Sequence, residues 1–165
     1  MPFGATSNAR LAEVHPLLAL KVRQLEQLLN AEGIDISVVQ GMRTWAEQDA
    51  LYAQGRTTPG PIVTNARGGE SAHNFGYAAD CAPMTKDLKA VDWDASHPSW
   101  KRMEELAGKV GLSSGANWVR FVDAPHLYLA NLPATPTAEM RQVLLNEGLK
   151  AFWDEFIKSG ETPTS

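Results

Sequence analysis

Apolar and polar positions near the start of the chain predict a helix followed by a strand. Over residues 10–31 apolar residues recur every three or four positions, which places them on one face of a helix. Proline is favoured in a first helical turn, so we expect the regular helix to begin near Pro16 and to end at Gly33. Residues 1–9 are expected to form a loose lead-in. Alternating apolar residues then predict a short half-buried strand that ends at Gly41.

A capping pattern opens the next predicted element. Thr44 followed three residues later by Glu47 is a capping box, and it predicts a helix over residues 44–54 that Gly55 ends. Residues 56–70 are rich in glycine and proline and predict a long loop. Loops of this length in compact domains are often functional.

The rest of the chain alternates short strands with helices. We expect strands at 77–82, 117–122 and 126–130, and helices at 98–110 and 137–158. A polar tail follows over 160–165. Helices interleaved with short strands predict the α+β class.

Composition limits the classes of protein to which this chain can belong. The chain has 165 residues, of which 44% are hydrophobic and 21% charged, as in an ordinary folded domain. Its 15 basic and 19 acidic residues give a net charge of -4, so we expect no nucleic-acid binding and no stable membrane insertion. The one cysteine excludes an internal disulfide. We see no secretory signal, and expect the protein to fold in the cytoplasm of the cell that makes it.

Two histidines lie in settings that suit metal chemistry. His73 precedes Asp80 by seven residues among small side chains, and a bare carboxylate in an apolar strand is costly unless it is paired or bound to a cation. The second setting is Asp123-Ala124-Pro125-His126, where proline fixes the backbone between two polar side chains. Hydrolytic zinc sites use three protein ligands, which His73, Asp80 and His126 would supply. Asp123 is the natural base for the activated water. The seven-residue spacing of His73 and Asp80 by itself also occurs by chance in proteins without a metal site.

Arg43 is a candidate for binding charge on the substrate. It lies at a predicted junction between strand and helix, where it could stabilise an oxyanion or hold a carboxylate in a bidentate grip. A structural ion pair is the alternative.

Other candidates are expected to be structural. Asp94 and His97 repeat the Asp-x-x-His spacing but precede a helix, where Ser96 or Ser99 is predicted as the cap. His15 next to Pro16 is expected to belong to a helix start, and Cys81 is expected to be a buried small hydrophobe.

Three stretches of the chain carry a family resemblance. They are Gly41-Met42-Arg43-Thr44-x-x-x-Gln48-x-x-Leu51-Tyr52-Ala53-Gln54-Gly55-Arg56, Ser71-x-His73-x-x-Gly76-x-Ala78-x-Asp80 and Trp118-x-x-Phe121-x-Asp123-x-Pro125-His126. Together they resemble the zinc D,D-peptidase/VanY superfamily, peptidase family M15. The resemblance is closest to the L-alanyl-D-glutamate endopeptidase branch, which includes phage endolysins.

The resemblance implies a role for each matching residue. It implies Zn²⁺ held by His73, Asp80 and His126, and a catalytic carboxylate at Asp123, where the branches that cleave D-Ala-D-Ala typically carry glutamate. Arg43 matches the arginine that binds substrate and transition state. Two further residues, Gln48 and Ser71, match positions that line the substrate site; the alternatives are a polar helix position and a turn cap. The implied fold is a small α+β domain with a short antiparallel sheet that carries the zinc site, as in D,D-peptidases and hedgehog-like domains.

The sequence departs from the family pattern in two places. Ser114-Gly115-Ala116-Asn117 stands where related sequences often have a glycine pair before Trp118, and Leu127 stands where an aromatic residue commonly follows the last histidine. Neither position is a ligand. Both affect the expected shape of the substrate groove, and therefore the choice of scissile bond.

These features lead to one expected function and two alternatives. We expect a monomeric zinc endopeptidase that cleaves the L-alanyl-D-glutamate bond of the peptidoglycan stem peptide, as a phage endolysin released at host lysis. The alternatives are a D-alanyl-D-alanine carboxypeptidase or dipeptidase and, in another class, an inactive peptidoglycan-binding module. Residues 1–132 are predicted to be the catalytic domain. Residues 133–165 are predicted to be a C-terminal helix and tail packed on it, with wall or partner binding as the alternative.

Overall fold

The computed structural model describes residues 1–158 and has the expected α+β architecture. Within this range one antiparallel sheet of four strands has the order β1-β2-β4-β3. The chain forms two compact units. We call residues 1–42 with 76–132 the sheet unit, and residues 43–75 with the described residues from 133 onward the turn unit.

The sheet unit begins with two helices, α1 (Ala5–Glu13) and α2 (Pro16–Ala31). Pro16 opens α2 as predicted, and His15 caps it because its Nδ1 accepts the N–H of Leu17 at 2.9 Å. The prediction of an irregular lead-in was wrong for residues 5–9. Leu11 and Ser7 of α1 are buried, and α1 packs on β1, so tertiary contact stabilises a helix whose local pattern is weak.

The strands of the sheet unit are β1 (Ile36–Gln40), β2 (Ala78–Pro83), β3 (Leu112–Gly115) and β4 (Asp123–Leu129). The predicted strand at 117–122 is absent: this stretch is turn and bend, and Val119 is 96% exposed. Strand β3 was not predicted from the sequence, because its four residues include only one large apolar side chain.

Strand β4 includes residues 123–125, which lie between the two strands predicted at 117–122 and 126–130. Pro125 has no register partner on β2, whose pairing with β4 spans His126 to Tyr128, and none on β3, where the register shifts between Ser114 and Gly115. A proline is tolerated inside a sheet at such an irregularity, since no ladder hydrogen bond requires its missing N–H.

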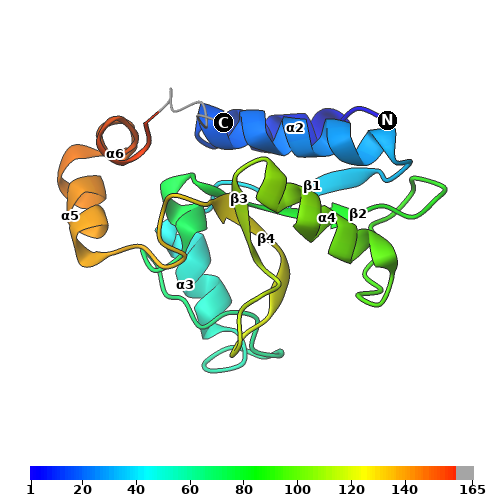
Figure 1. Ribbon diagram of the computed structural model, residues 1–165. Coiled ribbons are helices and arrows are strands. Elements are labelled where there is room, and N and C mark those ends of the chain that lie inside the picture. Colours follow the sequence, from blue (N-terminus) through cyan, green and yellow to red (C-terminus); the bar gives the residue numbers. More distant parts are fainter. Residues whose placement is uncertain (159–165) are drawn as a thin grey trace. The chain divides into compact units, whose positions relative to one another are not determined.

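Helix α4 (Pro98–Lys109) packs on α2 and β3 and completes the sheet unit (Figure 1). Its cap is His97, whose Nδ1 accepts the N–H of Ser99, so the prediction of a serine cap was wrong. The serine at position 96 instead bonds to Asp94. The core between these elements consists of the buried apolar residues Leu18, Val22, Leu25, Leu29, Val38, Cys81, Met103, Leu106, Leu127 and Leu129.

The turn unit contains α3 (Trp45–Ala53), a 3₁₀ helix η1 (Ala72–Phe75), α5 (Ala138–Glu147) and α6 (Leu149–Phe156). The predicted capping box of Thr44 and Glu47 opens α3. The single C-terminal helix expected over 137–158 is instead two helices, which lie against each other (Figure 1). Gly148 separates them with φ of +90°, a conformation that other residues rarely adopt. The predicted tail at 160–165 lies outside the described residues.

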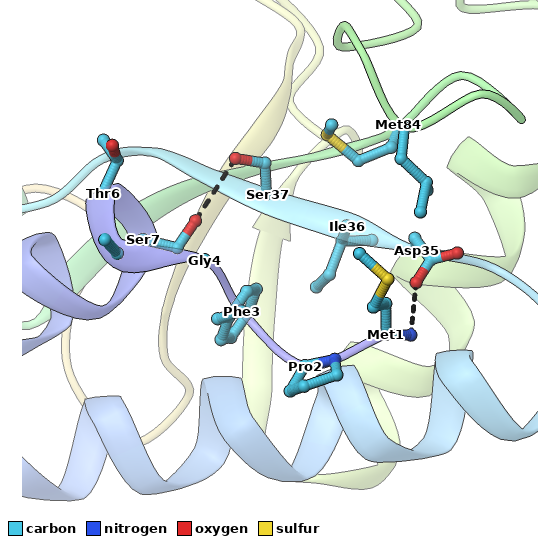
Figure 2. Close-up of a pocket in the computed structure, with 12 residues that line it drawn as sticks. Met1, Pro2, Phe3, Gly4, Thr6, Ser7, Asp35, Ile36, Ser37 and Met84 are labelled. Carbon is cyan, nitrogen blue, oxygen red and sulfur yellow. Dashed lines mark hydrogen bonds and ion pairs between the residues drawn. The ribbon is translucent and has the colours of Figure 1, made fainter.

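One pocket of about 260 Å³ lies in the sheet unit, between the N-terminal segment and β1 (Figure 2). The Met1 ammonium pairs with Asp35, and Ser7 bonds to Ser37 across it. Its lining contains none of the residues that sequence analysis selected for chemistry. The pocket is therefore separate from the candidate site described next.

Candidate metal centre

Two of the three predicted metal ligands lie opposite each other on paired strands. Asp80 of β2 and His126 of β4 are register partners, which brings their side chains within reach across the ladder. Oδ1 of Asp80 is 3.4 Å from Nδ1 of His126, and His126 is only 4% exposed. The backbone pairing of the sheet therefore sets the spacing of a carboxylate and an imidazole.

Aromatic rings surround His126. The ring of Trp118 lies 5.0 Å from the imidazole and that of Tyr128 lies 5.7 Å from it, both tilted. Trp118 is the tryptophan that begins the third motif. Its contact gives this motif residue a structural role, because the ring restricts the orientation of the imidazole.

Asp123, the predicted base, begins β4 at the register shift. In a regular strand, residues three apart point to opposite faces of the sheet. The register shift interrupts this alternation between Asp123 and His126, so their side chains need not point to opposite faces. Its partner is Gly115, where an added Cβ would lie 2.5 Å from the carbonyl oxygen of Asp123. Only glycine permits this close approach of β3 and β4. The catalytic role of Asp123 stays a prediction.

His73, the third predicted ligand, lies on η1 of the turn unit and is 2% exposed. Its N–H is accepted by Oγ of Ser71 at 3.3 Å, and its carbonyl accepts the N–H of Arg43 at 3.1 Å. The Ser71 side chain therefore caps the turn, which is one of its two predicted roles. The backbone of Arg43 is joined directly to the residue that carries the imidazole.

Asn74 is a residue that sequence analysis missed. It is buried, its Nδ2 donates to the carbonyls of Arg43 (3.0 Å) and Thr44 (3.4 Å), and its Oδ1 accepts the N–H groups of Gly69 (3.0 Å) and Ser71 (3.4 Å). One amide thus joins the loop before η1 to the start of α3. The signal available in the sequence was an amide side chain between the candidate ligand His73 and the aromatic Phe75, because a buried polar group needs hydrogen-bond partners.

Gln48 holds Arg43. Its Oε1 accepts Nη1 of Arg43 at 2.8 Å, and its Nε2 donates to the carbonyl of Ala66 at 2.9 Å. Gln48 is 0% exposed, whereas Arg43 is half-buried. The contact with Arg43 orients the guanidinium. Direct contact between Gln48 and a substrate stays a prediction.

His73, Asp80 and His126 form a group that could hold a metal ion. Each offers one ligand atom, and these atoms all lie within 4.8 Å of one another. Two imidazoles and one carboxylate are a donor set typical of hydrolytic zinc sites with three protein ligands. The residues present therefore fit a zinc ion.

The residues expected to be structural have structural contacts. His15 and His97 both cap helices, and neither belongs to the His73–Asp80–His126 group. Cys81 is fully buried, and burial raises the pKa of its thiol, so it behaves as a small core residue.

The fold and this ligand group define the class of protein. A family model described as VanY, D-alanyl-D-alanine carboxypeptidase, matches residues 11–118, so the chain belongs to this family of peptidases. The resemblance found in the sequence is thereby confirmed, as is the expectation of an enzyme in this class. The chain is 40% identical over 123 residues to the peptidoglycan L-alanyl-D-glutamate endopeptidase CwlK of Bacillus subtilis (strain 168), covering 70% of this chain and 73% of that relative.

Solved structures with the same fold extend the comparison. The L-Ala D-Glu endopeptidase ChiX of Serratia marcescens is 22% identical, with a TM-score of 0.57 over 78% of this chain and 90% of that one. The LD-carboxypeptidase LdcB is 17% identical, with a TM-score of 0.57 over 88% and 70%. A mutant of the D,D-pentapeptidase VanY in complex with Zn(II) is 16% identical, with a TM-score of 0.52 over 84% and 83%. These likenesses confirm the predicted fold class.

A membrane span was not expected from the sequence. Over residues 1–158, no helix is both long enough and apolar enough to cross a bilayer.

Proposed function

We propose that the protein is a zinc-dependent endopeptidase that hydrolyses the L-alanyl-D-glutamate bond of the peptidoglycan stem peptide. The observation that carries this is the His73–Asp80–His126 group in a chain 40% identical to an endopeptidase of that specificity. The aspartate at position 123 supports the same branch of the family, as the sequence resemblance implies.

The metal and the protein would divide the chemistry between them. Zinc bound by His73, Asp80 and His126 would polarise the scissile carbonyl and lower the pKa of a bound water toward about 7. Asp123 takes the proton from the attacking water and later delivers it to the leaving amine. The half-buried Arg43, oriented by Gln48, binds the developing oxyanion or a substrate carboxylate through its guanidinium. Ser71 shapes the turn and lines the substrate site.

Product analysis on defined muropeptides tests the scissile bond. Stem peptides are incubated with the zinc-loaded protein, with and without a chelator, and the products are identified by mass spectrometry. We expect chelator-sensitive release of the peptide that begins with D-glutamate. Release of free D-alanine or D-Ala-D-Ala with the alanyl-glutamate bond intact would instead favour the D-alanyl-D-alanine carboxypeptidase or dipeptidase, which the family description suggests.

A second measurement separates an enzyme from an inactive binding module. Turbidity of permeabilised Gram-negative cells is followed with and without a chelator. We expect clearing that the chelator abolishes, because Asp123 and Arg43 are both present. Binding to the walls without any clearing would favour the module.

The biological setting is part of the same proposal. The branch that the motifs resemble includes phage endolysins, so we propose that the protein acts on the wall or periplasm of a host cell after release from the cytoplasm. We also propose that it works as a monomer, and that residues 133–165 belong functionally to the catalytic domain of residues 1–132. Sedimentation of the full chain tests whether it is a monomer. Wall lysis when the protein is expressed together with a membrane-permeabilising protein tests its action on the host wall.

A further inference from the structure

The C-terminal helices lie beyond the residues that the family model matches, yet one of them contacts the turn that carries a metal ligand. Nε1 of Trp153 in α6 donates to the carbonyl oxygen of Phe75 at 2.8 Å. Phe75 is the last residue of η1, two positions after His73. This hydrogen bond joins α6 to η1, the segment of the turn unit that contains the candidate ligand His73.

Ring packing reinforces the hydrogen bond. The ring of Phe152 lies 5.0 Å from that of Phe75, and both side chains are fully buried. Trp45 of α3 contacts Phe75 as well, at 6.4 Å between ring centroids. Buried aromatic pairs of this kind stabilise beyond the area they bury. Phe75 is therefore held by side chains from both α3 and α6.

A short 3₁₀ helix depends on such outside contacts. Its hydrogen-bond geometry is poorer than that of an α-helix, and η1 has only four residues, all of them buried. Internal bonding alone therefore cannot fix the direction in which His73 points. Besides the bonds of Asn74 and Arg43 described above, Ser71 contacts the turn before His73 and Trp153 contacts it at Phe75, after His73.

We propose that Trp153 and Phe152 are positioning residues that hold η1 so that His73 is set for metal binding. The inference rests on the proposed zinc site. It assigns a role to α6 that neither the family match nor the sequence pattern gives. Groups outside the ligand set that orient a metal-binding histidine typically change metal affinity by about 10- to 100-fold when removed.

The test is the zinc affinity of Trp153→Phe in the full chain, measured by competition with a chromophoric chelator. This change keeps an aromatic ring and removes the N–H donor. We expect the zinc dissociation constant to rise about tenfold. We also expect a changed visible absorption spectrum of the cobalt-substituted protein, since that spectrum reports ligand geometry. Activity lost at limiting zinc should return at excess zinc.

Trp100→Phe is the matched control. Nε1 of Trp100 donates to the carbonyl of Asp92 at 3.0 Å, so the control removes the same kind of bond from the sheet unit. We expect its zinc affinity and cobalt spectrum to equal those of the wild type. If Trp153→Phe does not fold, judged by circular dichroism, Phe152→Leu is measured in its place with the same expectation.

The outcomes separate the two proposals. If the wild-type protein binds no zinc, the proposed function is wrong. If the wild type binds one zinc ion and both tryptophan variants bind it equally tightly, the proposed function stands and the positioning role of α6 is wrong.

Discussion

The two regions that supply the candidate metal ligands hold them by different means. Asp80 and His126 are placed by strand register, because they are direct partners in the β2–β4 ladder. His73 lies in a turn that has a backbone hydrogen bond to Arg43 and that is held as well by the side chains of Ser71 and Asn74 and, as we propose, of Trp153 far along the chain. The first region relies on backbone hydrogen bonds, which any strand-forming sequence supplies, whereas the second also depends on particular side chains.

The difference predicts different sensitivities. A ladder tolerates many side-chain changes but not the loss of a close backbone approach, such as that at Gly115. A side-chain network fails when one buried partner is removed, because the groups left behind are desolvated and unpaired. The predictions below test this contrast, beginning with the largest expected effect.

Asp123→Ala should have the largest effect on turnover. Removing a general base typically costs about 10²- to 10⁴-fold in rate, and the zinc ligands and strand pairing should be unaffected. The measurement is kcat on a defined muropeptide, together with bound zinc and the thermal midpoint Tm. Loss of zinc along with activity would mean that the side chain acts structurally.

His97→Ala is the control for this prediction. His97 follows Asp94 with the same spacing but caps α4. Its loss should change Tm modestly and leave kcat unchanged. Near-normal turnover in Asp123→Ala with strong loss in His97→Ala would show that the wrong Asp-x-x-His pair was chosen.

Gly115→Ala tests the backbone approach in the sheet region. Its Cβ would lie 2.5 Å from the Asp123 carbonyl oxygen, so β3 and β4 must separate locally. Overpacking of this kind costs about 1–3 kcal/mol. A displacement of about 1 Å at a catalytic group can lower the rate about 100-fold. Denaturant unfolding and kcat measure the two effects.

Gly108→Ala is the matched control for that change. Residue 108 lies inside α4, and apart from its chain neighbours and the backbone of its own helix no atom lies within 4 Å of the Cβ it would add. It should raise stability by about 0.4–1 kcal/mol and leave kcat unchanged. Equal effects of the two substitutions would contradict the close-approach argument.

Asn74→Ala tests the side-chain network of the turn region. It leaves the N–H of Gly69 and the carbonyl of Arg43 without this amide partner, at a cost of about 1–3 kcal/mol. Zinc affinity should fall as well, because Asn74 adjoins His73. Asn8→Ala, which removes an exposed amide bonded to Phe3 in the sheet unit, should leave zinc affinity unchanged. Equal zinc affinity in both variants would contradict the network's role.

The smallest effect concerns two glutamates at α2, which should respond to pH in opposite directions. Burial raises the pKa of Glu26, because it destabilises the ionised carboxylate. The resulting loss of folding stability is absent below the unfolded pKa and grows as pH rises through the folded pKa. Glu26→Gln should therefore raise Tm at neutral pH and not at acid pH, with kcat unchanged. The Tm gain at neutral pH should disappear on acidification; a gain independent of pH would contradict this.

Glu32 supplies the opposite case. The hydrogen bond from Arg102 lowers the pKa of Glu32. The folding stability that the ionised Glu32 contributes is therefore present above the unfolded pKa and is lost as pH falls through the folded pKa. Glu32→Gln should therefore lower Tm slightly at neutral pH and have no effect in acid. Thermal unfolding measured from about pH 3 to about pH 7 covers the titration of both carboxyl groups.

Much of the fold was predictable because local rules governed it. The capping box of Thr44 and Glu47 and the first-turn Pro16 act within a few residues, and both are where the pattern placed them. The failures came from tertiary effects. Helix α1 is stabilised by packing on β1, and β3 by pairing with β4, so neither has a strong pattern of its own. The break at Gly148 depends on one backbone conformation inside a continuous apolar pattern.

The candidate site was predictable to a similar extent and for similar reasons. The residues of the His73–Asp80–His126 group were found because their types and spacing form a motif. Asn74 and Trp153 were missed because their importance depends on which backbone groups they reach. Such contacts exist only after folding, and one of them spans 78 positions of the chain.

The bond from α6 to η1 also limits how the protein can be shortened or fused. A version cut after residue 132, where the sequence predicts the end of the catalytic domain, would retain every candidate ligand. It would lose the Trp153 indole that donates to Phe75. A shortened version of the protein should therefore preserve the chain through Phe156, and a fusion partner should be attached beyond that residue.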